Sequence, residues 1–483
     1  PKRENRRLIF FRRRKRECQR ARRALIKAGV SRDSPEFKDI TKHWFTLVHQ
    51  HNKLRKHLAM KEAARAKKRA CNAFRKDPYK FARELFQGPR NSNKPTFSKE
   101  DAQEYFSKTY RDEERNFNYE ALNEQPTPPK PEFQFQIRCP TLKELARHLR
   151  RKRNNAAPGF NSLTYVPYKK CPSLLYFVHK IGCKIWKEGV VPSDWGEAFI
   201  VLLSKSEVLS EVSEFRPIAL TSTVGKIFFS CVSDRIQHFM IKNSYINREK
   251  QKGFLSGLAG CLEHSFALHE AIREAKEHTR QLVITWIDLA NAYGSVRHNL
   301  IQFALNWYHV PKKVQKLIFN YYEHLRATVE ANDWSTGFFL FDIGLFQGCV
   351  LSTILFDCVF QLLLDFLKPI SKLGYTYKLA KFNSQHITKL DMAYADDLAL
   401  LTRTPDGNQK ACDRVVEWLD WTVSMKAKPR KCVSMGMRQF DRRIKCHTFD
   451  PAKGYEGLTY APFDPKLTIA GKAIRFIYDP DND

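Results

Sequence analysis

Two adjacent aspartates, Asp396 and Asp397, stand in the middle of the apolar run "LDMAYADDLALL". A buried charge without a partner costs on the order of several kcal/mol, so carboxylates in such surroundings normally pair with a cation or bind a metal ion. The apolar segments before and after the aspartates each contain enough residues to form a short strand. The run therefore predicts a β-hairpin with functional carboxylates at its tip.

A third carboxylate, Asp288, closes the apolar stretch "LVITWI" at residues 282–287, which predicts a buried strand. If this strand lies beside the hairpin, Asp288, Asp396 and Asp397 converge. Three converging carboxylates can hold two Mg²⁺ ions about 4 Å apart, which clamp the attacking and leaving oxygens of a phosphoryl transfer. For one such aspartate alone a turn or helix cap is the commoner role, so the hypothesis depends on convergence.

The charge of the chain points to an acidic partner. The formal net charge is +32, and residues 1–85 alone contain 28 Lys and Arg against 8 Asp and Glu, a local excess of +20. Two helix-forming basic runs in this segment favour a surface for nucleic-acid phosphates. The candidate contacts are Arg12, Arg13, Arg14, Lys67, Lys68 and Arg69. For either run alone, a solvated basic face or a nuclear-import patch is the alternative.

The twelve cysteines are scattered, with no CxxC pair and no Cys/His cluster at zinc-ligand spacing. This pattern predicts reduced thiols in a cytosolic or nuclear protein. No segment approaches the roughly 18 apolar residues that a membrane span needs. The first apolar patch lies among arginines, which argues against a signal peptide.

Hydrophobic periodicity predicts alternating helices and strands, and hence an α+β class. Ser98 and Asp101 have the spacing of a capping box, and the proline-rich residues 123–133 are typical of a linker. Expected helices cover residues 6–29, 37–86, 141–152 and 260–278, and one more follows "FQGC". Expected strands cover residues 197–205, 281–296, 328–334 and 337–345, while "FRPIALTSTVGKIFFSCVSDRI" is expected to be a loop that leads into a helix.

Five further residues have chemistry that suits a nucleotide. Lys205 ends an expected strand, and Arg216 lies in "FRPIAL"; both are cations suited to a triphosphate, although each alone is more often a surface charge. Tyr293 could clash with a 2′-hydroxyl, the group that distinguishes RNA from DNA, or could be an ordinary half-buried residue. Gln347 and Gly348 precede a helix, where a glycine lets backbone approach a substrate closely or merely forms a turn.

The order of these motifs resembles the reverse transcriptase family. The resemblance covers residues 141–437, and "APGFNSLTYVPYKKCP", "VVPSDWGEAFIVLLSK" and "FRPIALTSTVGKIF" are most similar to non-LTR retrotransposon polymerases, particularly lineages with a restriction-like endonuclease. The resemblance implies that Asp288, Asp396 and Asp397 bind two Mg²⁺ ions, with Mn²⁺ as an alternative. It also implies a steric gate at Tyr293, phosphate contacts from Lys205 and Arg216, and a nucleotide and template pocket at Gln347 and Gly348.

Lys431 matches the family lysine, so the resemblance implies that it protonates the leaving pyrophosphate, with Lys428 and Arg430 as neighbouring alternatives. The family fold is a right hand of fingers, palm and thumb. The implied division is a basic helical extension at residues 1–88, a helix and linker at 89–140, fingers at 141–270, palm with inserted fingers elements at 271–440, and the start of a truncated thumb at 441–483. In this chain "PGFNS" stands where the family often has Pro-Gly-Pro-Asp-Gly.

The resemblance implies target-primed DNA synthesis with template RNA, primer or target DNA and dNTPs as partners. An endonuclease domain is expected on a longer chain, and the expected compartment is the nucleus, after cytoplasmic assembly on element RNA. A domesticated RNA-binding protein without catalysis is one alternative. An RNA-dependent RNA polymerase is another, although Tyr-Ala-Asp-Asp with Tyr293 argues against it; telomerase and intron-maturase relatives share the three acids.

Overall fold

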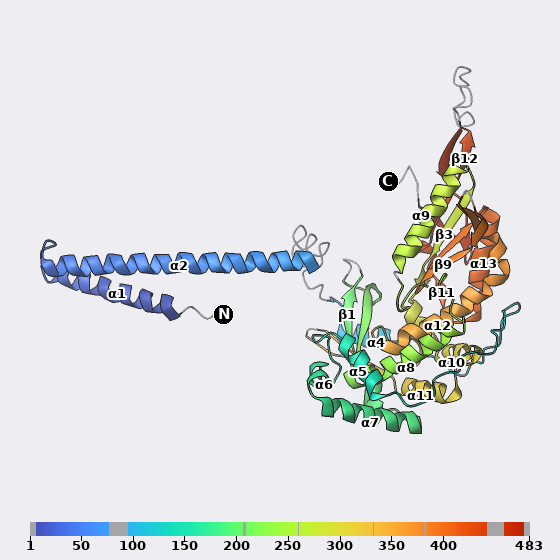
Figure 1. The fold of residues 1–483 in the computed structure, drawn as a ribbon, viewed down its shortest axis with the longest axis horizontal. Coiled ribbons are helices and arrows are strands. Elements are labelled where there is room, and N and C mark those ends of the chain that lie inside the picture. The colour runs from blue at the N-terminus through green and yellow to red at the C-terminus, as the bar shows by residue number, and fades with distance from the viewer. Residues whose placement is uncertain are drawn as a thin grey trace, which may run out of the picture. The chain divides into compact units, whose positions relative to one another are not determined.

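The computed structural model describes residues 6–76, 95–205, 209–258, 260–331, 333–380, 383–441 and 458–477. The chain divides into two compact units, Pro1–Asn93 and Lys94–Asp483. Helices and strands are mixed in the second unit (Figure 1), which confirms the predicted combination of the two. Within the described ranges, no helix is both long enough and apolar enough to cross a membrane.

The described residues of the first unit form two helices, α1 (Arg6–Lys27) and α2 (Pro35–Lys76), which pack against each other. The Arg22 guanidinium lies over the rings of Phe37 and Trp44, at 5.5 and 5.1 Å from their centroids, and this cation–π contact joins the helices. The two predicted basic helices are therefore present, although residues 77–86 of the second prediction lie outside the described residues.

The first sheet of the second unit has the order β2-β1-β5-β6. Strand β1 pairs antiparallel with β2 and parallel with β5. The prediction of a loop at the start of "FRPIAL" was wrong, because Phe215–Thr221 forms β2. Pro217 is accommodated because β2 is an edge strand of this sheet, where a missing N–H is tolerated. The strands are β1 (Glu197–Ser204), β2 (Phe215–Thr221), β5 (Arg326–Glu330) and β6 (Phe339–Leu340).

Helices surround this sheet (Figure 1). Both predicted helix starts are confirmed, because Ser98 with Asp101 and Thr141 with Glu144 form complete capping boxes. The helices on this side of the unit are α4 (Lys99–Thr109), α5 (Leu142–Arg151), α6 (Val166–Lys170), α7 (Pro172–Glu188), α8 (Thr223–Lys242), α10 (His298–Trp307) and α11 (Lys312–Glu323). Helix α12 (Val350–Phe366) is buried along nearly its whole length in the main core.

The second sheet has the order β13-β12-β3-β10-β9, with β16 paired to β12. Its strands are β3 (Leu282–Ile287), β9 (Asp391–Tyr394), β10 (Asp397–Thr402), β12 (Val433–Asp441), β13 (Leu458–Phe463) and β16 (Arg475–Phe476). Side chains alternate along β3: Leu282 and Ile284 pack with α9 (Cys261–Glu277), whereas Val283 belongs to the core that includes α13 (Pro405–Trp421). Each face is thus covered by a helix (Figure 1).

Short elements complete the unit. They are the strand pairs β4 (Leu289–Ala290) with β11 (Lys426–Ala427), β7 (Tyr375–Ala380) with β8 (Asn383–Lys389) and β14 (Thr468–Ile469) with β15 (Lys472–Ala473), and the 3₁₀ turns η1 (Ser193–Gly196), η2 (Val212–Glu214), η3 (Ala292–Ser295), η4 (Lys368–Leu373) and η5 (Pro429–Lys431). The predicted strand at residues 281–296 is shorter than expected, because β3 ends at Ile287, just before Asp288.

Candidate active site

The predicted hairpin is present at the edge of the second sheet. Strands β9 and β10 pair antiparallel, with Asp397 opposite Tyr394. The turn between them places Ala395 at φ +57°, a left-handed conformation that costs a residue with a Cβ about 1–2 kcal/mol. Asp396 follows this turn and is partly buried, while Asp397 is exposed at the start of β10.

The register between β3 and β10 brings the third carboxylate to the hairpin. Leu398 pairs with Ile287, so Asp288 and Asp397 are the next residues along their strands at the same end of the sheet. Burial raises the pKa of Asp396, and the charges of Asp397 and Asp288 raise it further, while Arg216 opposes them. Although Asp397 is exposed, partial desolvation raises its pKa, and the charge of Asp288 raises it further. The three acids therefore converge and repel one another.

Backbone contacts hold Asp288 in place from the opposite side. The Lys428 N–H donates to the Asp288 carbonyl oxygen at 2.7 Å, beside the β4–β11 pair. The Asp288 N–H donates to the Cys432 sulfur at 3.4 Å. Because both main-chain groups of Asp288 are bonded, its side chain leaves the end of β3 from a fixed backbone position.

The hairpin turn is held by a buried glutamine, Gln251. Its Oε1 accepts the N–H groups of Ala395 and Gly253 at 2.8 Å each, and its Nε2 donates to the Ala395 carbonyl at 3.0 Å. A Cβ at Gly253 would lie 2.2 Å from the Ala395 nitrogen, so a glycine is required for this close approach. Sequence reasoning missed Gln251; the glycine-containing segment "QKGFLSG" was the available signal.

Four cations gather near the acids. Lys205 follows β1, and Arg216 lies on the adjacent strand β2, where it pairs with Leu203. Partial desolvation of Lys205 lowers its pKa, and the charges of Lys428, Arg216 and Lys431 lower it further, while Glu214 opposes them. The four positive side chains are therefore close enough to repel one another. Such a cluster of positive charge is typical of a surface that binds a polyanion.

Tyr293 lies beside the acids on η3. Its ring stacks on Phe356 of α12, with centroids 4.6 Å apart and planes 7° from parallel. Burial raises its pKa, and the charges of Asp357 and Asp396 add to this effect. Among the described residues, the buried Tyr293 hydroxyl has no hydrogen-bond partner. Within the same part of the chain, both oxygens of the buried Asp357 also lack a partner, and burial raises the pKa of Asp357 strongly; sequence reasoning missed this residue.

Gln347 and Gly348 lie at the turn into α12 and dock against β2. The Ala219 N–H donates to the Gln347 carbonyl at 2.7 Å. Gly348 has φ +120°, and a Cβ there would lie 2.6 Å from the Ala219 carbonyl oxygen. A glycine is therefore required both by the backbone angle and by the contact with the strand that carries Arg216.

A cavity of about 370 Å³ opens beside the carboxylates. Asp288, Asp397 and Lys431 line it together with Tyr394 and Trp286. Lys431 is thus placed near two of the acids. The cavity is large enough to receive part of a substrate at the end of β3.

The carboxylates suit divalent ions by their chemistry, because Mg²⁺ prefers oxygen ligands and keeps several of its waters. The three carboxylates do not form a tight cage. Among the described residues, potential ligand atoms that all lie within 4.8 Å of one another come instead from Cys139, His179 and Cys183. An open arrangement fits two ions about 4 Å apart that share carboxylates with a substrate phosphate.

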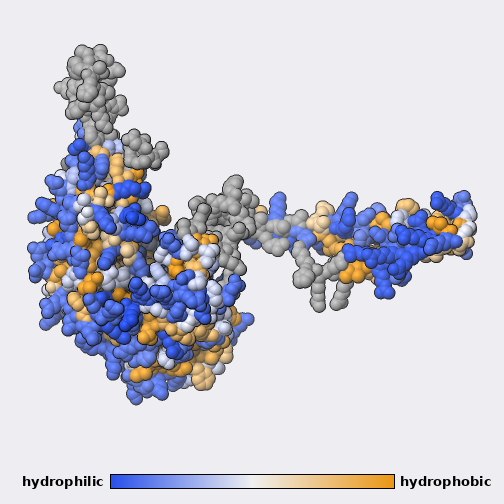
Figure 2. All heavy atoms as spheres, turned by 180° about the vertical axis from the view of Figure 1, so that it is seen from behind, coloured by the Kyte–Doolittle hydropathy of each residue, from blue (hydrophilic) through white to orange (hydrophobic). Residues whose placement is uncertain are grey.

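The predicted nucleic-acid contacts of the first unit face solvent wherever their side chains are described. Arg12, Arg13, Arg14, Lys67 and Lys68 are exposed, and the side chain of Arg69 lies outside those described. Arg13 forms an ion pair with Glu17 at 3.2 Å. Hydrophilic side chains cover much of the visible face of α1 and α2 (Figure 2).

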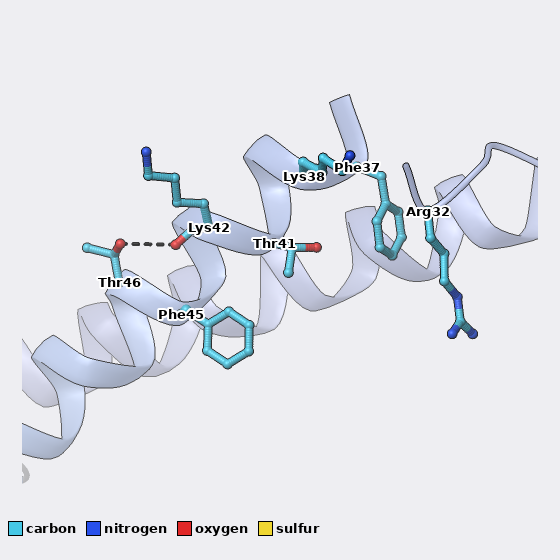
Figure 3. A pocket seen from close by; sticks show the side chains of 7 residues that line it. All are labelled: Arg32, Phe37, Lys38, Thr41, Lys42, Phe45 and Thr46. Carbon is cyan, nitrogen blue, oxygen red and sulfur yellow. Dashed lines mark hydrogen bonds between the residues drawn. The ribbon is translucent and has the colours of Figure 1, made fainter. Parts of the chain in front are cut away.

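A shallow cavity of about 470 Å³ lies at the turn between α1 and α2. Phe37, Thr41 and Phe45 line one face of α2, and Arg32 comes from the preceding turn (Figure 3). Phe45 is 61% exposed, whereas Phe37 is buried, and Lys38 and Lys42 line the same cavity. An exposed ring near cations is typical of surfaces that stack bases and bind phosphates.

Comparisons with known proteins agree with this arrangement. The model of the family "Reverse transcriptase (RNA-dependent DNA polymerase)" matches residues 204–444, which include the three acids, Arg216 and Tyr293.

Three curated relatives are similar over much of this chain. The retrovirus-related Pol polyprotein from type-2 retrotransposable element R2DM of Drosophila melanogaster is 27% identical over 311 residues, covering 64% of this chain and 27% of that protein. The Pol polyprotein from type-1 retrotransposable element R2 of Nasonia vitripennis is 24% identical over 351 residues, covering 68% and 32%. The RNA-directed DNA polymerase from mobile element jockey of Drosophila melanogaster is 24% identical over 368 residues, covering 70% and 37%. The chain thus spans about a third of the length of these relatives.

Proposed function

Because residues 204–444 make this chain a member of the reverse transcriptase family, we propose that it is an RNA-directed DNA polymerase of a non-LTR retrotransposon. The observation that carries the proposal is the convergence of Asp288, Asp396 and Asp397 beside four cations. Nucleotidyl transfer needs carboxylates that bind metal ions, and beside them Lys or Arg side chains that bind the phosphates of the nucleotide.

In this proposal the three carboxylates hold two divalent ions, Mg²⁺ or Mn²⁺. When bound, these ions supply activation of a primer 3′-hydroxyl and neutralisation of the charge that develops on the phosphates. Asp288 is held through its own backbone, and Asp396 and Asp397 through the hairpin, so the three side chains start from fixed backbone positions before substrate arrives.

The cations take the phosphates of the incoming nucleotide. Lys205 and Arg216 lie on adjacent strands, so a point charge and a planar fork can bind the same triphosphate. Lys431 lines the cavity with Asp288 and Asp397, where it can donate a proton to the leaving pyrophosphate; Lys428 is the neighbouring alternative. Binding of the triphosphate would reduce the repulsion among these positive side chains, and this reduction favours nucleotide binding.

Tyr293 is the proposed selector for deoxynucleotides. Its ring is buttressed by Phe356 and lies near Asp396, so a sugar held at the acids would lie against it. A fixed ring leaves room for hydrogen at the 2′ position but not for hydroxyl. Gln347 and Gly348 would line the nucleotide and template pocket from the turn into α12.

The surrounding parts follow from the same proposal. The first sheet with its helices would form fingers, the second sheet the palm, and the basic helices of the first unit would bind template RNA or target DNA. The substrates would be template RNA, a primer made of nicked target DNA, and dNTPs, with an endonuclease on a longer chain. Such target-primed synthesis would take place in the nucleus.

Primer extension tests the proposal. The full chain is incubated with poly(A), oligo(dT) and Mg²⁺, and with either dTTP or UTP. We expect incorporation of dTTP and not of UTP. Incorporation of UTP would identify an RNA-dependent RNA polymerase instead, and tight RNA binding without incorporation of either nucleotide would identify an RNA-binding protein.

A further inference from the structure

A cluster of sulfur and nitrogen atoms lies outside the candidate active site. Cys139 precedes α5, and His179 and Cys183 lie one turn apart on α7. One ligand atom from each lies within 4.8 Å of the other two. All three side chains are partly buried, and both cysteines are free thiols. We propose that Cys139, His179 and Cys183 form a structural Zn²⁺ site, independent of the function proposed above.

The distances within the cluster are close to those of a tetrahedral zinc site. Zn–S bonds of about 2.3 Å and Zn–N bonds of about 2.0 Å place sulfur and nitrogen about 3.5 Å apart and two sulfurs about 3.8 Å apart. His179 Nε2 lies 3.5 Å from Cys183 Sγ, which matches. The sulfurs of Cys139 and Cys183 are 2.9 Å apart, so they must separate by about 0.9 Å when the ion enters.

The donor set selects the metal. Two thiolates and an imidazole favour Zn²⁺ over Mg²⁺ or Ca²⁺, which prefer oxygen. Two thiolates also neutralise the two charges of Zn²⁺, so the occupied site would carry no net charge in its partly buried position. The Pro140 carbonyl oxygen, 3.0 Å from His179 Nε2, or a water molecule could supply a fourth ligand.

The ion would fasten an irregular segment to α7. Residues 133–140 have no helix or strand, yet Trp186 donates to the Ile137 carbonyl at 2.8 Å, and Arg235 donates to the Gln136 carbonyl at 3.1 Å. A bond from Cys139 to His179 and Cys183 through the metal would close a loop of about 40 residues. We therefore expect zinc to stabilise the fold without contributing to catalysis.

The histidine limits the expected affinity. Its Nδ1 is buried and makes no hydrogen bond among the described residues, whereas zinc-bound histidines usually donate their second N–H to an acceptor that strengthens the bond. Loss of such an acceptor typically weakens metal binding by about 10- to 100-fold. The site should therefore bind zinc more weakly than four-cysteine sites do.

Cobalt substitution and metal analysis of the full chain test the site. The reduced chain is titrated with Co²⁺ in excess Mg²⁺, which keeps the carboxylates occupied, and thiolate-to-cobalt charge-transfer absorption is recorded. We expect saturation at one equivalent, displacement by Zn²⁺ and a higher unfolding temperature with Zn²⁺. Cys183→Ser and Cys139→Ser should each lose the absorption, while Cys171→Ser, which changes an exposed cysteine outside the cluster, should keep it.

Three outcomes would overturn the proposal. They are absence of the charge-transfer band in the wild-type chain, persistence of the band in the Cys139→Ser Cys183→Ser double variant, and recovery of a Cys139–Cys183 disulfide in place of bound metal. Far-UV circular dichroism of each variant separates loss of the site from loss of the fold.

Discussion

Gln251 holds the main chain of Ala395 from both sides, donating to its carbonyl at 3.0 Å and accepting its N–H at 2.8 Å. Ala395 has the left-handed conformation that turns the hairpin, and Asp396 is the next residue. The backbone position of a candidate catalytic acid therefore depends on a glutamine that is far away in sequence and bonds to the hairpin main chain.

Gln251→Leu should reduce kcat for nucleotide addition by at least about tenfold, with a smaller effect on RNA binding. The substitution leaves buried backbone groups of Ala395 and Gly253 without partners, at about 1–3 kcal/mol for each such group. Gln237→Leu is the matched control, because Gln237 also bonds to backbone of the same segment, at Phe254 and Ser256, but not to the hairpin. Equal kcat values for Gln251→Leu and wild type would contradict a positioning role.

Gly348→Ala should destabilise the fold by about 1–3 kcal/mol and lower activity. The cost arises because φ +120° is strained for alanine and its Cβ would lie 2.6 Å from the Ala219 carbonyl. Gly471→Ala is the control, since Gly471 also has a positive φ but has open space around its Cβ position. Urea denaturation of both variants measures the difference. A similar decrease in the free energy of unfolding in Gly348→Ala and Gly471→Ala would show that the contact with Ala219 has no effect on stability.

Tyr293→Ala should raise the use of UTP relative to dTTP by at least about tenfold, because the ring that we propose to lie against the sugar is removed. Tyr293→Phe should keep wild-type selectivity and stability, since the ring remains stacked on Phe356 and the lost hydroxyl has no hydrogen-bond partner in the described part of the chain. The ratio of kcat/KM for the two nucleotides is the measurement. Unchanged selectivity in Tyr293→Ala would exclude Tyr293 as the selector.

Asp397→Asn should stabilise the metal-free chain at neutral pH, because it removes repulsion between like charges on neighbouring strands. Interactions between such cross-strand pairs are worth about 0.2–1 kcal/mol, and we expect a gain of this size. The pKa of Asp397 is raised by burial and by Asp288, so its ionised form is disfavoured in the fold. Wild-type stability should therefore fall as pH rises from the unfolded pKa through the higher folded pKa, and the variant should lack this fall.

Urea denaturation in EDTA and in excess Mg²⁺ checks this expectation. In excess Mg²⁺ the wild-type chain should be more stable than Asp397→Asn, because the wild-type carboxylates bind the ion. Lower stability of Asp397→Asn in EDTA would contradict repulsion among the three acids.

Local patterns in the sequence were sufficient to predict the hairpin, the capped helices and the existence of the strand before Asp288, although the expected range 281–296 was too long because β3 ends at Ile287. Each depends on periodicity or capping within a few residues. The prediction for Phe215–Thr221 was wrong because Pro217 suggests a loop unless its strand is known to lie at an edge, which only the sheet order reveals.

The supporting residues of the site could not be predicted in the same way. Gln251 reaches Ala395 across 144 positions, and Cys139 reaches Cys183 across 44. Such pairs have no local signature, so the cysteine spacing, which predicted no cluster, missed the group that contains His179. The roles of the basic residues of α1 and α2 stay predictions.

Primer extension by Asp396→Asn, compared with wild type and with Asp413→Asn, tests the central claim most directly. Asp413 is an exposed aspartate on α13, outside the candidate site. We expect dTTP incorporation on poly(A) by wild type and Asp413→Asn, and loss of at least about a thousandfold in Asp396→Asn with RNA binding retained, because oriented metal-bound charge supplies several kcal/mol of transition-state stabilisation. Incorporation by Asp396→Asn at the wild-type rate would contradict the assignment of the acids.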